Sequence, residues 1–328
     1  MIATRKTKED RPVLAICYDF DKTLSPDDMQ AQGYIQAVYD GDVQTFWNES
    51  NALAEKNEMD SNLAYMYKMV HEARGRIICT KKTLADYGAK VTLFPGVEEW
   101  FERIRQYGND HGVIVEHYII SSGLKEMIEG TSIAKAGAFE KIYASSFMFD
   151  DRGVAVWPAQ AINYTNKTQY IFRIAKGFLE EYDERVNDSM KEKTMYIPYE
   201  NFVYIGDSAT DIPCMRLVKS KGGYSIGVFD PVKNARNKVY QLYSDGRINL
   251  YAPADYSEGS DLCRLMEKII DEIATREAIK AEQETLSNNA EIYRRYCAMS
   301  SILPTLPPED AEKFRTTLEE MQAKLAGK

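Results

Sequence analysis

The feature that most constrains this chain is a short apolar run that ends abruptly in two carboxylates. Residues 13–18, Val-Leu-Ala-Ile-Cys-Tyr, have the length and composition of a buried strand in a parallel sheet. Asp19 and Asp21 follow at its carboxyl end, where open α/β sheets bind their ligands. Because residues i and i+2 of an extended chain point the same way, we expect both carboxylates to share one small volume, with Phe20 turned into the core.

Two carboxylates held this close repel each other unless a cation or a shared proton offsets their charge. A hard divalent metal that prefers oxygen ligands is the simplest source of that charge, and Mg²⁺ is the expected ion. Beside such a metal, one carboxylate can act as a nucleophile and the other as an acid or base. The pair Asp19 and Asp21 therefore predicts a metal-assisted catalytic centre.

The chain has 328 residues, which is more than one minimal domain, and 44 % of them are hydrophobic, enough to bury a sizeable core. Strand-like apolar runs predict an α/β core from residues 1–24 and 89–256. Residues 25–88 carry apolar side chains at helical spacing and no long strand-like run, which predicts an inserted all-helical segment. Residues 257–328 are predicted to form a C-terminal helical appendage. Its helices are expected over 261–279, 289–300 and 308–325.

The net charge and the cysteine pattern indicate which partners and which compartment to expect. The formal net charge of −9 disfavours non-specific binding to nucleic acid, which needs a basic surface. The five cysteines are odd in number and form no CxxC pair, which favours reduced thiols over a disulfide framework or a zinc site. The run 13–18 is too short for a signal peptide or a membrane span. We therefore expect a cytoplasmic protein with neither nucleic acid nor membrane as a partner.

Further polar residues stand at the ends of other predicted elements. Residues 113–120 are a second predicted strand, and Ser121 and Ser122 follow it before a helix, so that hydroxyls and free backbone N–H groups form an anion site. Lys167 falls in the first turn of a predicted helix, where the helix dipole disfavours a cation. That position indicates another role, although a solvated surface lysine explains it equally well.

A second pair of carboxylates follows the strand predicted over residues 202–205. The segment 206–211 reads Gly-Asp-Ser-Ala-Thr-Asp and places Asp207 and Asp211 after that strand, as Asp19 and Asp21 follow the first. Strands are also expected over 224–228 and 249–252, and a hairpin over 147–157.

The order of these motifs resembles the haloacid dehalogenase-like (HAD) hydrolase superfamily. The resemblance rests on residues 19–23 (Asp-Phe-Asp-Lys-Thr), Ile119-Ile120-Ser121, Lys167 and residues 206–211, and it spans about residues 14–228. Two aspartate motifs of this form, each after an apolar strand, make chance agreement improbable. The resemblance implies a Rossmann-like parallel sheet, and the helical segment 25–88 looks most like the C1-type cap of the phosphoserine-phosphatase-like branch.

The resemblance also implies a reaction, the hydrolysis of a small phosphorylated metabolite through an aspartyl-phosphate. Asp19 would attack phosphorus, and Asp21 would protonate the leaving oxygen and then deprotonate the attacking water. Asp19, Asp207 and the backbone carbonyl of Asp21 would hold Mg²⁺.

Four more residues receive roles from the same resemblance. Ser121 and Lys167 would bind the phosphoryl oxygens, and Ser122 could take the place of Ser121. Asp211 would orient Lys167 or a water, and the Thr23 hydroxyl would steady the turn after the first motif.

Other functions stay open on the sequence alone. A phosphotransferase of the same fold would differ only in the acceptor that the cap admits. A catalytically idle HAD-like binding or scaffold module would use the appendage 257–328 to recruit a partner. A homodimer through the C-terminal helices is a further expectation, and the chain does not reveal which phosphate ester it would accept.

Overall fold

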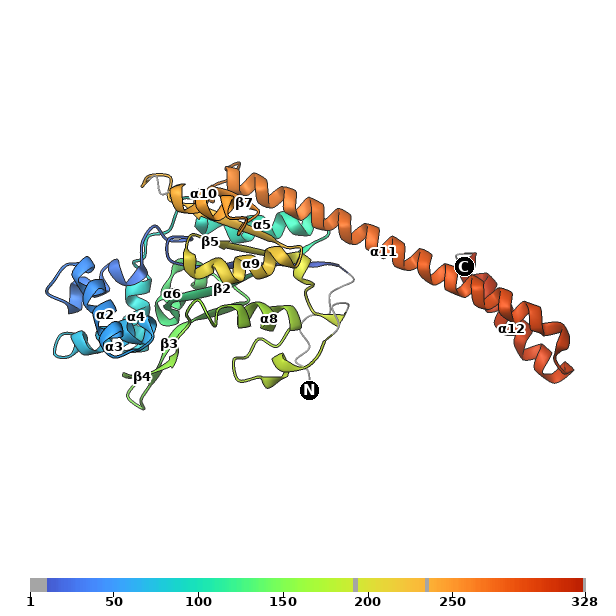
Figure 1. Ribbon diagram of the computed structural model, residues 1–328, viewed down its shortest axis with the longest axis horizontal. Coiled ribbons are helices and arrows are strands. Elements are labelled where there is room, and N and C mark those ends of the chain that lie inside the picture. The colour runs from blue at the N-terminus through green and yellow to red at the C-terminus, as the bar shows by residue number, and fades with distance from the viewer. Residues whose placement is uncertain (1–10, 191–193, 234–235, 327–328) are drawn as a thin grey trace. The chain divides into compact units, whose positions relative to one another are not determined.

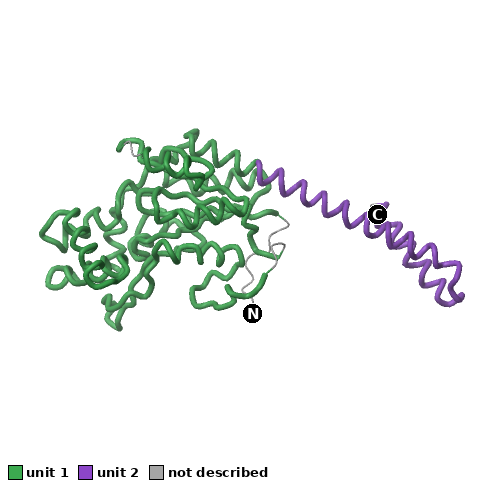
Figure 2. Tube along the Cα trace, in the orientation of Figure 1, with its two compact units in different colours: residues 1–271 green, residues 272–328 purple. Residues whose placement is uncertain are grey.

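The computed structural model describes residues 11–190, 194–233 and 236–326. The chain divides into two compact units, residues 1–271 and 272–328, which Figure 2 colours separately. The first unit contains the sheet and every residue that the sequence places in the candidate site.

The core of the first unit is a seven-stranded sheet in the order β4-β3-β2-β1-β5-β6-β7. Every neighbouring pair is parallel except β3 and β4, which confirms the predicted Rossmann-like α/β core and the predicted hairpin. The chain winds outward from β1 to one side and then returns to β5 on the other, so the strand order reverses at β1. The crevice at such a reversal is where this kind of sheet binds ligands. The strands are β1 (Val13–Tyr18), β2 (Ile114–Leu124), β3 (Lys141–Phe149), β4 (Ala155–Gln160), β5 (Phe202–Gly206), β6 (Tyr224–Phe229) and β7 (Leu250–Pro253).

Strand β1 is buried along its whole length because helices cover both faces of the sheet. Val13, Ala15 and Cys17 belong to one core cluster with residues of α8 (Thr168–Lys176) and α9 (Ile212–Ser220). The alternate residues point to the opposite face, where the ring of Tyr18 meets Phe101 of α5 (Val97–Asp110) edge-on, with the ring centroids 5.6 Å apart. Burial on both faces explains why β1 is continuously apolar.

The predicted helical insertion follows β1 and is present as four helices, which lie together on the left in Figure 1. Polar residues begin three of them: the side chains of Asp42, Asp60 and Thr80 accept hydrogen bonds from first-turn backbone N–H groups. The insertion is tied to the core through α3, where the Asn62 amide donates to the Ile162 carbonyl at 2.6 Å. The helices are α1 (Tyr34–Val38), α2 (Val43–Lys56), α3 (Ser61–Ala73) and α4 (Lys81–Gly88), preceded by the 3₁₀ turn η1 (Met29–Ala31). Shorter helices α6 (Lys125–Gly130), α7 (Ser132–Lys135) and α10 (Arg236–Ser244) complete this unit.

The C-terminal helices are α11 (Asp261–Ile302) and α12 (Pro308–Leu325). The predicted break between residues 279 and 289 is wrong, because α11 runs through it as one 42-residue helix. The apolar periodicity fades there, yet residues 280–288 contain neither Gly nor Pro to end a helix. Among the described residues, no helix is both long enough and apolar enough to cross a membrane.

A chain of buried hydrogen bonds links α5 to the two central strands. The indole N–H of Trp100 donates to the Tyr18 hydroxyl at 2.8 Å, and that hydroxyl lies 3.0 Å from Nδ1 of His117. Nε2 of His117 lies 3.2 Å from the Phe101 carbonyl, which can only accept, so Nε2 carries the proton and Nδ1 accepts from Tyr18. Burial, with a smaller contribution from the charge of Arg105, lowers the pKa of His117 to about 3.

Replacement of His117 by glutamine tests this network through the pH dependence of stability. The unfolded imidazole gains a proton below about pH 6.5, whereas the folded one stays neutral to about pH 3. The unfolded state therefore binds more protons in this window, and stability falls as the pH falls. This group alone removes about 2 kcal/mol between about pH 7.5 and pH 5, and H117Q should lack that share in urea unfolding at both pH values.

The control is H111Q, because His111 is exposed at the end of α5. H111Q leaves the Trp100, Tyr18 and His117 network in place, so this variant should still lose the His117 share of stability below about pH 7.5. An H117Q variant with the same pH dependence as the wild type would show that His117 is not buried as a neutral group.

Candidate active site

The candidate site lies at the carboxyl ends of β1, β2 and β5, at the reversal of the strand order. The backbone N–H of Asp19 donates to the Ile205 carbonyl at 3.0 Å, which continues the β1–β5 ladder and fixes Asp19 beside the end of β5. Phe20 is fully buried, as predicted, and its carbonyl accepts from the N–H groups of the three residues 23–25, which makes a tight turn. The Thr23 hydroxyl, expected to steady this turn, is buried and finds no hydrogen-bond partner among the described residues. The backbone holds the turn instead.

A buried lysine stands at the centre of the site. Nζ of Lys167 lies 3.2 Å from Oδ1 of Asp19 and 2.7 Å from Oδ1 of Asp211, and the lysine side chain is fully buried. Burial alone would lower the pKa of Lys167, but the charges of Asp19 and Asp211 outweigh it and hold that pKa above its usual value. The interpretation of Lys167 as a solvated surface residue is therefore wrong. The second interpretation, a separate role for this lysine, agrees with its position.

Asp211 is committed to the protein through both carboxylate oxygens. Oδ1 accepts from the Tyr204 hydroxyl at 2.8 Å as well as from Lys167, and Oδ2 accepts from the N–H and the hydroxyl of Ser208 at 3.3 and 3.2 Å. Gly206 permits this arrangement, because a Cβ there would lie 2.6 Å from Oδ2 of Asp211. Asp211 is thus a fixed anion that positions Lys167.

The site gathers more negative charge than Lys167 can balance. Asp19, Asp207 and Asp211 offer oxygens that all lie within 4.8 Å of one another. Burial and the charge of Asp211 raise the pKa of Asp19 to about 6, although Lys167 lowers it. Burial, with the charges of Asp211 and Asp19, raises the pKa of Asp207 well above its usual value. Such a crowd of oxygens fits a divalent cation.

Asp19 and Asp207 are the residues best placed to hold that cation. The oxygens of Asp211 already receive protein donors, whereas no hydrogen bond from the described residues reaches the Asp207 side chain. The donor set is all oxygen, which is the chemistry that Mg²⁺ selects.

Asp21 stands apart from this cluster. Its Oδ1 accepts from the backbone N–H of Met29 at 2.8 Å, and its Oδ2 faces Gly123, where a Cβ would come within 2.9 Å. Burial, with the charges of Asp28 and Asp19, raises the pKa of Asp21 well above its usual value. A raised pKa makes the Asp21 carboxyl hold a proton more readily than a free aspartate does, which suits an acid, while Asp19 faces a cation.

Ser121 and Ser122 lie where strand β2 becomes irregular. Its pairing with β3 shifts register between Ile120 and Leu124, so the strand extends beyond the predicted end at residue 120. The Ser121 hydroxyl is buried and accepts from the Gly123 N–H at 3.0 Å. The Ser122 carbonyl accepts from the Tyr65 hydroxyl at 2.7 Å, which ties cap helix α3 to the site. Ser121 and Ser122 thus lie at the carboxyl end of β2, and no hydrogen bond among the described residues joins either side chain to Asp19, Lys167 or Asp207.

Three residues of the site escaped the sequence analysis. Tyr204 could have been found as the one hydroxyl-bearing residue of an otherwise aliphatic strand end, two residues before the second aspartate motif. Tyr65 carries no comparable signal, because helical aromatic residues usually pack in a core. Lys22 adopts a left-handed backbone conformation with φ of 59° and pairs with Asp28 at 2.8 Å, and no sequence pattern announces either property.

Comparison with known proteins agrees with this geometry. A family model described as haloacid dehalogenase-like hydrolase matches residues 16–216. An uncharacterized protein of Borreliella burgdorferi is 26 % identical over 286 residues, which cover 78 % of this chain and 96 % of that protein.

Solved structures resemble the chain mainly in fold. A probable phosphoserine phosphatase from Vibrio cholerae superposes with a TM-score of 0.51 at 11 % identity, over 82 % of this chain and 69 % of that one. A HAD family hydrolase from Salmonella enterica serovar Typhi gives a TM-score of 0.47 at 20 % identity, over 70 % of this chain and 66 % of that one.

Replacement of Lys167 by methionine tests the central ion pair. The change keeps the length of the side chain but leaves Asp19 and Asp211 buried without their shared cation. Breaking a buried pair in this way should lower the free energy of unfolding by about 3–5 kcal/mol, measured by urea unfolding at neutral pH in excess chelator.

The control is K135M, since Lys135 is exposed at the end of α7. It should change the free energy of unfolding by less than about 0.5 kcal/mol. A K167M variant as stable as K135M would contradict a stabilising role for the buried pair.

Proposed function

Because the chain belongs to the haloacid dehalogenase-like hydrolase family, we propose that it is a Mg²⁺-dependent phosphatase that hydrolyses a small phosphomonoester through an aspartyl-phosphate. The observation that carries the proposal is the buried carboxylate of Asp19, which lies 3.2 Å from Nζ of Lys167 and within 4.8 Å of an oxygen of Asp207. A carboxylate in this setting is shielded from water and faces positive charge, as a nucleophile that attacks an anion must be.

The first half of the reaction needs one nucleophile and one acid. An oxygen of Asp19 attacks phosphorus, a new P–O bond forms, and the bond to the leaving oxygen breaks. Asp21, whose pKa is raised by burial, gives its proton to that oxygen so that an alcohol departs. Phosphate is then bound to Asp19 as an acyl phosphate.

In the second half of the reaction the two residues exchange the direction of their roles: Asp21 accepts a proton, and Asp19 becomes the leaving group. Asp21 is now a carboxylate and takes a proton from a water, whose oxygen attacks phosphorus. The bond between phosphorus and Asp19 breaks, inorganic phosphate leaves, and both side chains return to their first states. No further reactant is needed.

Charge neutralisation decides whether Asp19 can approach a phosphate at all. Lys167 and the Ser121 hydroxyl are the residues expected to contact the phosphoryl oxygens, with the N–H groups of the irregular end of β2. Asp211 and Tyr204 keep Lys167 in place and charged. When Mg²⁺ is bound by Asp19, Asp207 and the backbone carbonyl of Asp21, it supplies the positive charge that lets two anions meet.

The nucleophile is tested by Asp19→Asn, which removes the attacking oxygen anion with little change in shape. Hydrolysis of p-nitrophenyl phosphate should fall by at least about 1,000-fold, while circular dichroism shows an intact fold. The control is D27N in the same loop, because Asp27 is exposed, and its rate should stay near that of the wild type. A D19N variant that retains most of its activity would place the nucleophile elsewhere.

Metal dependence is tested with the same substrate. Excess EDTA should abolish turnover, and added Mg²⁺ should restore it. Asp207→Asn should raise the Mg²⁺ concentration needed for half-maximal rate by at least about tenfold, whereas D27N should not change it. Full turnover in excess chelator would contradict the proposed role of the metal.

A further inference from the structure

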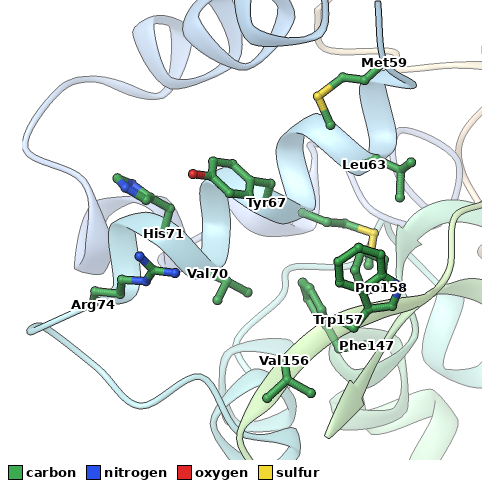
Figure 3. Close-up of a pocket in the computed structure, with 11 residues that line it drawn as sticks. Met59, Leu63, Tyr67, Val70, His71, Arg74, Phe147, Val156, Trp157 and Pro158 are labelled. Carbon is green, nitrogen blue, oxygen red and sulfur yellow. The ribbon is translucent and has the colours of Figure 1, made fainter. Parts of the chain in front are cut away.

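A second cavity lies outside the catalytic cluster, between cap helix α3 and the hairpin of β3 and β4 (Figure 3). Its volume is about 310 Å³, within the range of small-molecule pockets. Both walls are apolar: Leu63, Tyr67 and Val70 come from α3, and Phe147, Trp157 and Pro158 come from the hairpin.

The aromatic side chains of this cavity are exposed to an unusual degree. Trp157 is 67 % exposed and Tyr67 is 52 % exposed, from opposite walls. Large aromatic side chains on a soluble domain are usually buried, and a cluster of exposed ones marks a binding surface. The Tyr67 ring stacks on His71 with the ring centroids 5.6 Å apart, so a flat apolar body placed between the two walls would cover Trp157 and the exposed part of Tyr67.

A cation stands on the helix side of the same cavity. Arg74 ends α3, and among the described residues no carboxylate pairs with it. Its neighbours differ: Arg76 pairs with Asp40, and Lys68 pairs with Glu49 and Glu72. In a chain with a net charge of −9, an arginine left unpaired beside an apolar cavity favours an anionic ligand group.

The hairpin edge is poorly suited to a peptide strand. The N–H of Ala155 already donates to the Cys79 carbonyl at 2.8 Å, and Thr80 and Val154 form an isolated bridge on the same edge. Pro158 has no N–H to offer. A small molecule is therefore the occupant that the cavity favours.

We propose that this cavity binds a small ligand with a planar aromatic body and an anionic substituent, the rings lying between Tyr67 and Trp157 and the anion facing Arg74. The site does not depend on the proposed hydrolysis, because none of the residues assigned to catalysis lines it.

Two fluorescent probes of nearly the same shape test separately whether the cavity binds an aromatic body and whether it prefers an anion. 8-Anilinonaphthalene-1-sulfonate carries an anion, and N-phenyl-1-naphthylamine is its neutral counterpart. Both should bind the folded full chain. Trp157→Ala should weaken both by about tenfold, since a central aromatic contact is lost. Arg74→Glu should weaken the sulfonate by about fivefold or more and the neutral probe by less than about twofold.

The matched control is R152E, which makes the same charge change on the turn between β3 and β4, where Arg152 is exposed and pairs with Asp150. It should bind both probes as the wild type does. Should W157A disturb the hairpin in near-ultraviolet circular dichroism, Tyr67→Ala repeats the test from the other wall. Unchanged binding in W157A and Y67A overturns the site, and equal loss of both probes in R74E overturns its preference for an anion.

Discussion

The contact on which the rest of the site depends is the buried pair between Lys167 and Asp211. A fully buried ammonium is stable only with partners, and Asp211 supplies one at 2.7 Å. Asp211 in turn requires the Tyr204 hydroxyl and the absence of a side chain at Gly206. This scaffold holds a positive charge 3.2 Å from Asp19, which keeps a buried carboxylate ionisable beside two others. Asp211, Tyr204 and Gly206 therefore act on Asp19 through the position of Lys167.

The two aspartates of the first motif are two residues apart in the sequence but lie in chemically different environments. Asp19 shares its surroundings with Lys167, so its pKa rises only to about 6. Asp21 faces Gly123 and the Met29 N–H, and burial, with the charges of Asp28 and Asp19, raises its pKa well above its usual value. In the proposed reaction, this difference in environment would let two identical groups act as nucleophile and as acid.

Local sequence patterns were enough to predict the central strands and the aspartates that follow them. Buried parallel strands must be apolar throughout, so β1 and β5 and the carboxylates after them could be found in the sequence. The burial of Lys167 could not, because its partner lies 44 residues away and only the fold joins them. The continuity of α11 was missed for the opposite reason: apolar periodicity reports packing, whereas residues 280–288 need only helix propensity to stay helical.

Helix α3 contributes side chains to the end of β2 and to the cavity beside the hairpin. Tyr65 points to the Ser122 carbonyl at the catalytic edge, whereas Tyr67 and Val70 line the cavity beside the hairpin. Residues two apart on a helix lie on different faces, so one helix can serve both sites without sharing a side chain. The hydrogen bond from Tyr65 holds one face of α3 at the end of β2, and another face lines the cavity.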